Sequence, residues 1–433
     1  MIAANLALLG SFAALLCLGT PIAVALGLAG VVGILTGLDA YALATIGTNT
    51  YNGIAKYPLI AVPLFILTGM IFERSGVAAK LVRFAGAIVG PRRGGLAVVA
   101  VLVCMLMGGM SGSGPADAAA VATVMIPSMA KAGYPRAFSA SVIAASASTA
   151  ILIPPSIALI IYSIMVPGMD LRALFAAGLV PGLLAGLAIA VPTVWLSRRH
   201  DFGAREEKSR PDFWPSFMGA VPGLLAPVII LGGLRSGLFT PTEAAVVAVF
   251  YGLIVGVFIY RTMGWRDIYA TMADAAKTSA VIMIIVSLAG IFAWAGSTLG
   301  AFDMAAKALF ALSDNGYVIM AIVMVVLLLA GMVLDGISIY LIFLPLLIPL
   351  MKTFAWNPTW FGVLMAMNIA IGQFTPPVAV NLMVSTQIGG VTMESSIRWA
   401  IWFVASMALA MVFVIMVPGI ALWLPEALGY ATN

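Results

Sequence analysis

The chain has very few charged side chains. Only 9% of its 433 residues are Asp, Glu, Lys or Arg, whereas 63% are hydrophobic. An average soluble domain is roughly 45–50% apolar and about 25% charged. A compact soluble fold cannot bury so much apolar surface, which excludes a cytosolic enzyme, a nucleic-acid-binding protein and a disordered linker. The surrounding solvent must therefore be lipid. At roughly 20 apolar residues per span, the chain has room for about ten membrane-spanning helices.

Cysteine and histidine are almost absent as well. The two cysteines, Cys17 and Cys104, lie inside apolar runs and give neither a disulfide framework nor the spacing of a metal site. The single histidine, His200, stands in the charged stretch 198–201, where a solvated loop residue is expected. Zinc sites and Ser–His–Asp hydrolases usually need histidine, so the sequence predicts that the protein is not an enzyme.

The sequence repeats itself. At a constant spacing of 222 positions, Gly109 recurs as Gly331, and the pair Pro154-Pro155 recurs as Pro376-Pro377. A register that is held through both Pro-Pro pairs predicts two structural repeats. The longest polar run of the chain lies between them. The predicted domains are a first repeat at 1–197, a cytoplasmic linker at 198–212 and a second repeat at 213–433.

The distribution of Lys and Arg predicts how the repeats are oriented. The first repeat carries seven basic residues between 74 and 136, whereas the matching segment of the second carries only Lys307 and Lys352. The preceding segments show the reverse, with one basic residue in the first repeat against three in the second. The positive-inside rule therefore places equivalent loops on opposite sides of the membrane. The repeats are predicted to be inverted, and both termini are predicted to be periplasmic.

Inverted repeats need an odd number of spans each, and the apolar segments fit five spans and one hairpin per repeat. Basic residues flank both outer ends of the first hairpin, which predicts that it enters and leaves the membrane on the cytoplasmic side. The predicted fold class is an all-α polytopic membrane protein with inverted repeats, about ten spans, two opposed re-entrant hairpins and two broken helices. Spans are expected at 3–18, 20–37, 58–73, 136–166, 171–197, 215–234, 238–260, 278–295, 359–388 and 397–424, hairpin arms at 94–110, 117–133, 316–334 and 337–352, and interfacial segments at 41–57, 75–90 and 264–277.

Both hairpin turns carry polar residues at bilayer depth. The first turn, 108–115, holds four glycines, two serines and a proline, and the second, 331–338, holds Asp335 in an apolar stretch. Irregular backbone at this depth persists only where it is buried in protein or lines a wet cavity. The first turn is therefore predicted to bind a small cation or a carboxylate, with close packing of small residues as the alternative. Asp335 is predicted to bind as well, with a helix cap as the alternative, and Asp117 is open between these two roles.

Each Pro-Pro pair interrupts a long apolar segment. Proline removes an amide donor and clashes with the carbonyl four residues back, so two in a row predict a broken helix rather than a kink. Matched breaks in inverted repeats direct helix dipoles and free carbonyl groups at the midplane, where transporters bind their substrates and ions. The predicted substrate-binding residues are Ser111, Gly112, Ser113, Gly114, Pro155, Asp335, Gly336 and Pro377.

Three longer motifs occur in order along the chain: GGMSGSGPADAAAVATVMIPSMAKAGYPRAFSASVIAASASTAILIPPSI, GMVLDGISIYLIFLPLLIP and IGQFTPPVAVNLMVS. They resemble the large membrane subunit of tripartite ATP-independent periplasmic (TRAP) transporters, and the similarity runs essentially from end to end. The resemblance implies a Na⁺-driven secondary transporter of the ion-transporter superfamily, which imports an organic acid across the bacterial inner membrane. A periplasmic binding protein would deliver the substrate. Because the chain begins with the first span of the large subunit, the small membrane subunit is expected to be a separate chain.

The same resemblance implies an elevator mechanism and two sodium sites. The transport block would comprise about 58–166 and 278–390, with the other spans as a scaffold. Ala150 and Ala379 stand where the family frequently has glycine. A stand-alone Na⁺–carboxylate symporter without a binding protein is the alternative, and an intramembrane enzyme is a third reading. By the family's pattern, one Na⁺ site would use Ser111, Ser113, Thr149, Leu152 and Pro154, and the other would use Gly372, Thr375 and Val378 with Asp335 close by.

Overall fold

The computed structural model describes residues 2–204 and 210–432, so part of the expected linker, at 205–209, lies outside the described residues. Within these ranges the chain forms only helices and their connections, which confirms the predicted all-α fold. The first half contains α1 (Ile2–Cys17), α2 (Ile22–Gly37), η1 (Ala40–Ala44), α3 (Thr45–Ile54), η2 (Tyr57–Ile60), α4 (Ala61–Arg74), α5 (Val77–Val89), α6 (Gly95–Ser111), α7 (Gly114–Lys131), α8 (Arg136–Ala147), η3 (Ser148–Ile151), α9 (Ile157–Met165) and α10 (Leu171–Arg199).

The second half repeats this order of elements. Two helices are followed by a long helix, a short helix, a hairpin, an interrupted helix and another long helix. Its elements are α11 (Phe213–Arg235), α12 (Pro241–Ile254), the π-helical segment η4 (Val255–Ile259), α13 (Trp265–Leu299), α14 (Ala301–Phe310), α15 (Gly316–Gly331), α16 (Gly336–Thr353), α17 (Pro358–Gly372), α18 (Val380–Gly389), α19 (Met393–Met416) and α20 (Gly419–Ala427).

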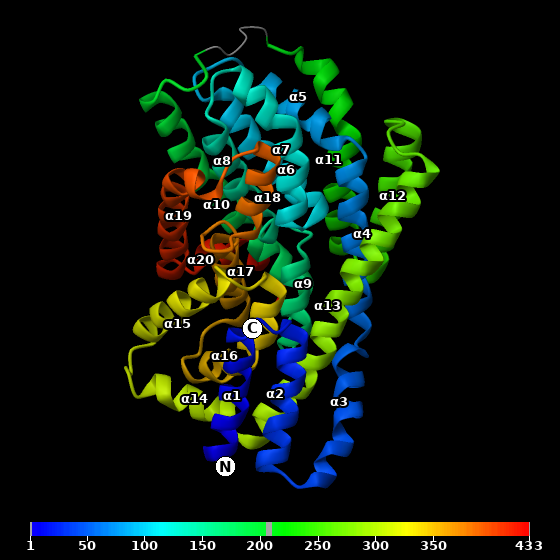
Figure 1. Cartoon of the computed structure of the whole chain (residues 1–433). Coiled ribbons are helices and arrows are strands. Elements are labelled where there is room, and N and C mark those ends of the chain that lie inside the picture. The colour runs from blue at the N-terminus through cyan, green and yellow to red at the C-terminus, as the bar shows by residue number, and fades with distance from the viewer. Residues whose placement is uncertain (1, 205–209, 433) are drawn as a thin grey trace.

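The two helical hairpins, α6–α7 and α15–α16, open in opposite directions. In Figure 1 the outer ends of α6 and α7 lie towards the top of the molecule beside α5, whereas α15 and α16 open in the lower part near α14. The turns of both hairpins face the middle of the molecule. This arrangement agrees with the opposed hairpins that the charge pattern predicts.

Seven of the described helices are long and apolar enough to cross a membrane. The expected count of about ten spans is therefore not established, because several expected spans are shorter than 18 residues. Helices α1 and α2 have 16 residues each, and the expected spans 136–166 and 359–388 are each divided into two shorter helices. A helix of 16 residues is about 24 Å long, less than the roughly 30 Å of a hydrocarbon core.

Helix α13 differs from the expectation. The sequence predicted an interfacial segment at 264–277 and a separate span at 278–295, but the structure forms one helix of 35 residues, Trp265–Leu299. No proline occurs within this segment, so nothing interrupts its backbone hydrogen bonds. The corresponding chain of the first half is broken before η2, whose second residue is Pro58. The expected last span, 397–424, extends too far along the chain, because helix α19 ends at Met416, before Pro418.

The helices pack in three groups. Helices α1, α2 and α3 pack with α13, and α4 and α5 pack with α11 and α12. The hairpins and the interrupted helices form the third group, which we call the core group. Helices α10 and α19, which the sequence analysis placed in the scaffold, pack against α6, α8 and α17 of the core group.

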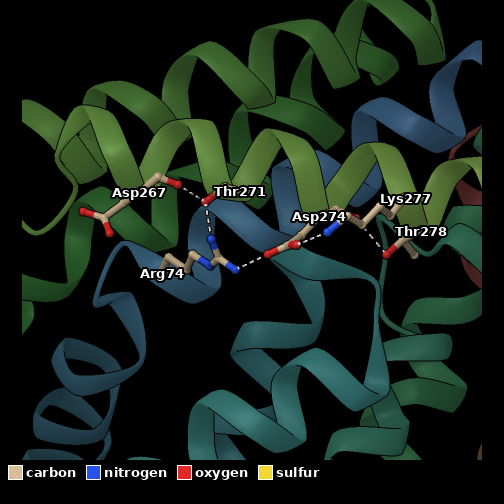
Figure 2. Close-up of polar contacts among 6 residues, drawn as sticks. All are labelled: Arg74, Asp267, Thr271, Asp274, Lys277 and Thr278. Atoms are coloured by element: carbon tan, nitrogen blue, oxygen red, sulfur yellow. Dashed lines mark hydrogen bonds and ion pairs between the residues drawn. The ribbon is translucent and has the colours of Figure 1, made fainter.

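An ion pair joins α4 to α13, and Figure 2 shows it. Nη2 of Arg74 lies 2.6 Å from Oδ2 of Asp274, and Nη1 donates to Oγ1 of Thr271 at 3.1 Å. Lys277 approaches the other carboxylate oxygen of Asp274 at 3.6 Å. Arg74 ends α4 immediately before the segment that leads to the first hairpin, so this contact fixes the outer end of α4 on α13.

Candidate functional site

Both Pro-Pro pairs interrupt a helix, as predicted. Helix α8 continues into η3, which ends at Ile151, and α9 begins only at Ile157. Helix α17 ends at Gly372, and α18 begins at Val380. We call the segments 152–156 and 373–379 the first and second breaks. Both Pro-Pro peptide bonds are cis.

The turn of the first hairpin packs directly on the first break. Gly112 has a left-handed backbone with φ of 61°, and a Cβ atom there would lie 2.5 Å from the carbonyl oxygen of Pro155. A Cβ atom on Gly108 would lie 2.7 Å from Cα of Ala150. At Gly112 only glycine tolerates both the backbone angle and the close approach, and at Gly108 the close approach leaves no room for a side chain. The glycine-rich sequence of the turn therefore allows the hairpin to contact the broken helix through its backbone.

The second hairpin meets the second break in the same way. A Cβ atom on Gly372 would lie 2.7 Å from the carbonyl carbon of Gly331, so the two backbones touch. The N–H of Val378 donates a hydrogen bond to the carbonyl of Met332 at 3.1 Å. Each turn thus rests on the break of its own half.

The two halves meet at Gly114. A Cβ atom there would lie 2.6 Å from Oε1 of Gln373 and 2.8 Å from Nδ2 of Asn381. Nδ2 of Asn381 donates to the carbonyl of Ala144 at 3.4 Å. The amide oxygens of both side chains are buried without a hydrogen-bond partner in the described part of the chain. Sequence analysis missed these two amides, although both stand in the motif that contains the second Pro-Pro pair.

A cavity of about 190 Å³ lies between the two turns. Five of the predicted substrate-binding residues line it, namely Gly112, Ser113 and Gly114 of the first half and Asp335 and Gly336 of the second. Its described lining contains no lysine, arginine or histidine. Residues that were not predicted complete the wall: Ile66, Gly69, Met70, Pro115, Ala116, Ile151, Ile157, Ala158, Thr278, Ile282, Ile337 and Gln373.

Asp335 caps helix α16 while it lines this cavity. Its Oδ2 accepts hydrogen bonds from the N–H groups of Ile337 at 3.1 Å and Ser338 at 3.3 Å, and its Oδ1 accepts from the hydroxyl of Ser338. The helix-cap interpretation of the sequence is therefore what the geometry shows. A role in binding stays a prediction, which the position of Asp335 on the cavity wall supports.

Asp117 has a different environment. It is fully buried, and its Oδ1 accepts a hydrogen bond of 2.7 Å from the hydroxyl of Ser111. That hydroxyl in turn accepts from the N–H of Ser113 at 3.2 Å. Asp117 does not cap α7, because the N-cap residue is Ser113 and no side chain completes that cap. The N–H groups of Gly114 and Ala116 consequently have no side-chain acceptor at this cap, and Pro115 between them has no N–H.

Three predicted substrate-binding residues, Ser111, Pro155 and Pro377, are not among the residues that line the cavity. The hydroxyl groups of two predicted sodium ligands bond to their own helices: Thr149 donates to Ser146 at 2.7 Å, and Thr375 donates to Ile371 at 2.6 Å. The sodium roles stay predictions. Among the predicted sodium ligands of the breaks, Pro154 lies beside Gly109 of the first hairpin, and Gly372 and Val378 contact Gly331 and Met332 of the second.

The comparisons with known proteins agree along almost the whole chain. The family described as "Tripartite ATP-independent periplasmic transporter, DctM component" matches residues 9–420. The 2,3-diketo-L-gulonate TRAP transporter large permease protein YiaN of Escherichia coli is 35% identical over 415 residues, which cover 96% of this chain and 97% of the relative. The C4-dicarboxylate large permease DctM of Pseudomonas aeruginosa is 36% identical over 404 residues, with coverage of 93% and 94%.

Two further similarities concern length and fold. The isethionate TRAP transporter permease protein DctMQ of Oleidesulfovibrio alaskensis is 33% identical over 417 residues, and the chain spans only 65% of its length. The solved structure of the Alcanivorax borkumensis YdaH transporter shares the fold, with a TM-score of 0.63, 15% identity and 90% coverage of both chains. The family match and the full-length relatives show that the chain belongs to the TRAP transporters, as their DctM component, the large membrane subunit.

Proposed function

We propose that the chain is the permease subunit of a Na⁺-coupled secondary transporter that imports an organic acid across the bacterial inner membrane. One observation carries the proposal: both hairpin turns, the residues on either side of the first break and Gln373 of the second break line a single cavity at the interface of the two halves. The uncapped N-terminus of α7 offers backbone N–H groups and a positive dipole end to a carboxylate there. Nothing in this arrangement suggests a reaction, so the acid is proposed to cross unchanged.

Electrostatics support the coupling to a cation. The described cavity lining contains the carboxylate of Asp335 and no basic side chain, and Asp117 is buried close to the same turn. An anionic substrate in this low-dielectric site would meet negative charge without compensation. Bound Na⁺ would neutralise it. The serine hydroxyls and free carbonyl groups of the turns and breaks are hard oxygen ligands suited to such an ion.

For the transport movement, we propose an elevator in which the core group moves against the other two groups of helices. The packing supports including α10 and α19 in the moving block, because both lie against hairpins and broken helices. Compared with the boundaries expected from sequence, 58–166 and 278–390, the moving block would then gain these two helices and lose α4, α5 and the end of α13. Helix α4 would stay with α13, to which Arg74 binds it.

The family implies a small membrane subunit and a periplasmic binding protein as partners. We propose that this chain works with both of them. A stand-alone symporter is less favoured, since YiaN and the DctM of Pseudomonas aeruginosa, which match along nearly the whole chain, are TRAP large permeases. We also propose that both termini are periplasmic, on the charge pattern alone.

Uptake by the reconstituted complex tests the proposal. Proteoliposomes that contain the large and small subunits are supplied with the binding protein and the acid that it holds, with a Na⁺ gradient, a K⁺ gradient or no gradient. We expect uptake only with the Na⁺ gradient and the binding protein together. Uptake that does not need Na⁺ would contradict the proposal, and uptake that does not need the binding protein would favour the stand-alone symporter.

A further inference from the structure

The cavity between the two hairpin turns has few polar side chains and an otherwise mostly aliphatic wall. Its polar side chains are Ser113, Thr278, Asp335 and Gln373. Five isoleucines, a methionine and an alanine supply most of the remaining side-chain surface. They come from α4, η3, α9, α13 and α16: Ile66, Met70, Ile151, Ile157, Ala158, Ile282 and Ile337.

We propose that the transported substrate is a monocarboxylate with a compact, branched aliphatic group. This inference rests on the proposed function and narrows the class of acid. The carboxylate would lie at the uncapped N-terminus of α7, where Gly114 and Ala116, which both carry a backbone N–H, line the cavity on either side of Pro115. The aliphatic group would lie against the isoleucines, because burial of apolar surface is favourable and roughly proportional to the area removed from water.

The wall disfavours a dicarboxylate. A second carboxylate would lie against aliphatic side chains or beside Asp335, and no arginine, lysine or histidine lines the described cavity to pair with it. Both oxygens of Asp335 already accept hydrogen bonds from residues of α16, so this side chain is engaged within its own helix and does not serve as a partner for a second carboxylate. An unpaired charge in such a place is strongly unfavourable.

A polyhydroxylated sugar acid also fits poorly. Each hydroxyl that loses its water on entering the cavity needs a hydrogen-bond partner, or the cost of its dehydration is not recovered. With only four polar side chains in the described lining, most hydroxyls of such an acid would remain without side-chain partners. The volume of about 190 Å³ suits a small molecule.

Direct binding to the permease tests the inference without the selectivity of the binding protein. Thermal unfolding of the purified complex of large and small subunits is measured in NaCl or KCl with 4-methyl-2-oxopentanoate, succinate or gluconate. We expect Na⁺-dependent stabilisation by 4-methyl-2-oxopentanoate, with a half-maximal concentration at least tenfold lower than for either comparison acid.

Two single-residue variants of α13 test whether the aliphatic wall of the cavity contacts the ligand. Ile282 of α13 lines the cavity, whereas Ile284 is 54% exposed on the same helix. Ile282→Ser is expected to raise the half-maximal concentration for 4-methyl-2-oxopentanoate at least fivefold, and Ile284→Ser is expected to leave it unchanged. Ile66→Ser gives a second test of the wall if Ile282→Ser fails to fold.

The outcomes separate this inference from the proposed function. Stronger stabilisation by succinate or gluconate than by 4-methyl-2-oxopentanoate, still dependent on Na⁺, would overturn the substrate class and leave the transporter in place. Stabilisation by no acid in either salt would overturn both. An equal effect of Ile282→Ser and Ile284→Ser would show that the aliphatic wall does not contact the ligand.

Discussion

Single glycines decide how closely the first hairpin approaches the broken helix. Gly112 and Gly168 both have left-handed backbones, but only Gly112 has a neighbour, the carbonyl oxygen of Pro155. A Cβ atom at Gly168 would meet nothing within 4 Å. The pair therefore separates the cost of the backbone angle from the cost of the contact.

We expect Gly112→Ala to destabilise the protein more than Gly168→Ala does. A left-handed alanine costs about 1–2 kcal/mol at either position, and at Gly112 the clash with backbone adds to this. The thermal unfolding midpoint of each variant in detergent gives the comparison. Equal midpoints would mean that the turn does not rest on the break.

A second prediction concerns the polar residues of the two turns. Ser113→Ala and Asp335→Ala are each expected to abolish Na⁺-dependent uptake in proteoliposomes while the protein stays folded. Loss of the Asp335 cap should cost only about 1 kcal/mol of stability. Asn315→Ala removes the cap of α15, where the side chain accepts from Tyr317, and is a control remote from the cavity lining. Unchanged Na⁺ dependence in both turn variants would refute their assignment to ion sites.

The chemistry of the turns could be predicted because glycine, serine and aspartate are conspicuous in an apolar sequence. The amides of Gln373 and Asn381 could not, since their meeting with Gly114 depends on how one half packs on the other. The same holds for the hydrogen bond between Ser111 and Asp117. Side-chain partners that lie six residues apart across a turn follow from its backbone path, which composition does not specify.

At the scale of elements, the proline pairs predict where helices are interrupted. The sequence does not show as clearly where a helix continues without a break. Both breaks stand where a Pro-Pro pair predicts them. The continuous α13 was divided in the sequence analysis because its first part is mixed in polarity, and polarity indicates where a helix leaves the lipid, not where it ends. Helix α14 was not expected, since the segment that contains it carries charged residues between two apolar runs.

The contact between α4 and α13 gives a prediction for these elements. The side chains of Arg74 and Asp274 are 37% and 43% exposed, so their ion pair is expected to contribute at most about 1 kcal/mol. A double-mutant cycle of Arg74→Ala and Asp274→Ala on thermal stability measures this coupling. Lys277→Ala is the matched control, because Lys277 is 79% exposed at 3.6 Å from the same carboxylate. A coupling no larger than that of Lys277 would show that the pair does not fasten α4.

At the scale of the whole molecule, the orientation in the membrane can be tested by labelling. In a Cys17→Ser background, Ala204→Cys is expected to react only from the cytoplasmic side and Asp314→Cys only from the periplasmic side. The reason is the positive-inside rule, applied to the basic residues around the first hairpin and the linker. Labelling of both from one side would refute the inverted arrangement, and exchange of the two sides would invert the topology. The buried Cys104 should not react.

The internal repeat made most of the architecture predictable. A constant spacing between matched motifs fixed the order of hairpins and breaks, and the structure has that order in both halves. It was harder to predict from the sequence which helices pack together. Helices α10 and α19 are long and apolar like α11 and α12, yet they pack on the core group. Length and hydropathy report contact with lipid, whereas the choice of a protein neighbour depends on surface shape.

Gly114 of one half fills the space beside Gln373 and Asn381 of the other, so the centre of the molecule belongs to neither copy of the repeat. A larger side chain at one of these positions requires a smaller side chain on the other side of the interface. The sequences of the two repeats must therefore change together at these positions. Replacing either repeat by a copy of the other would leave a void or a steric clash at the centre of the molecule.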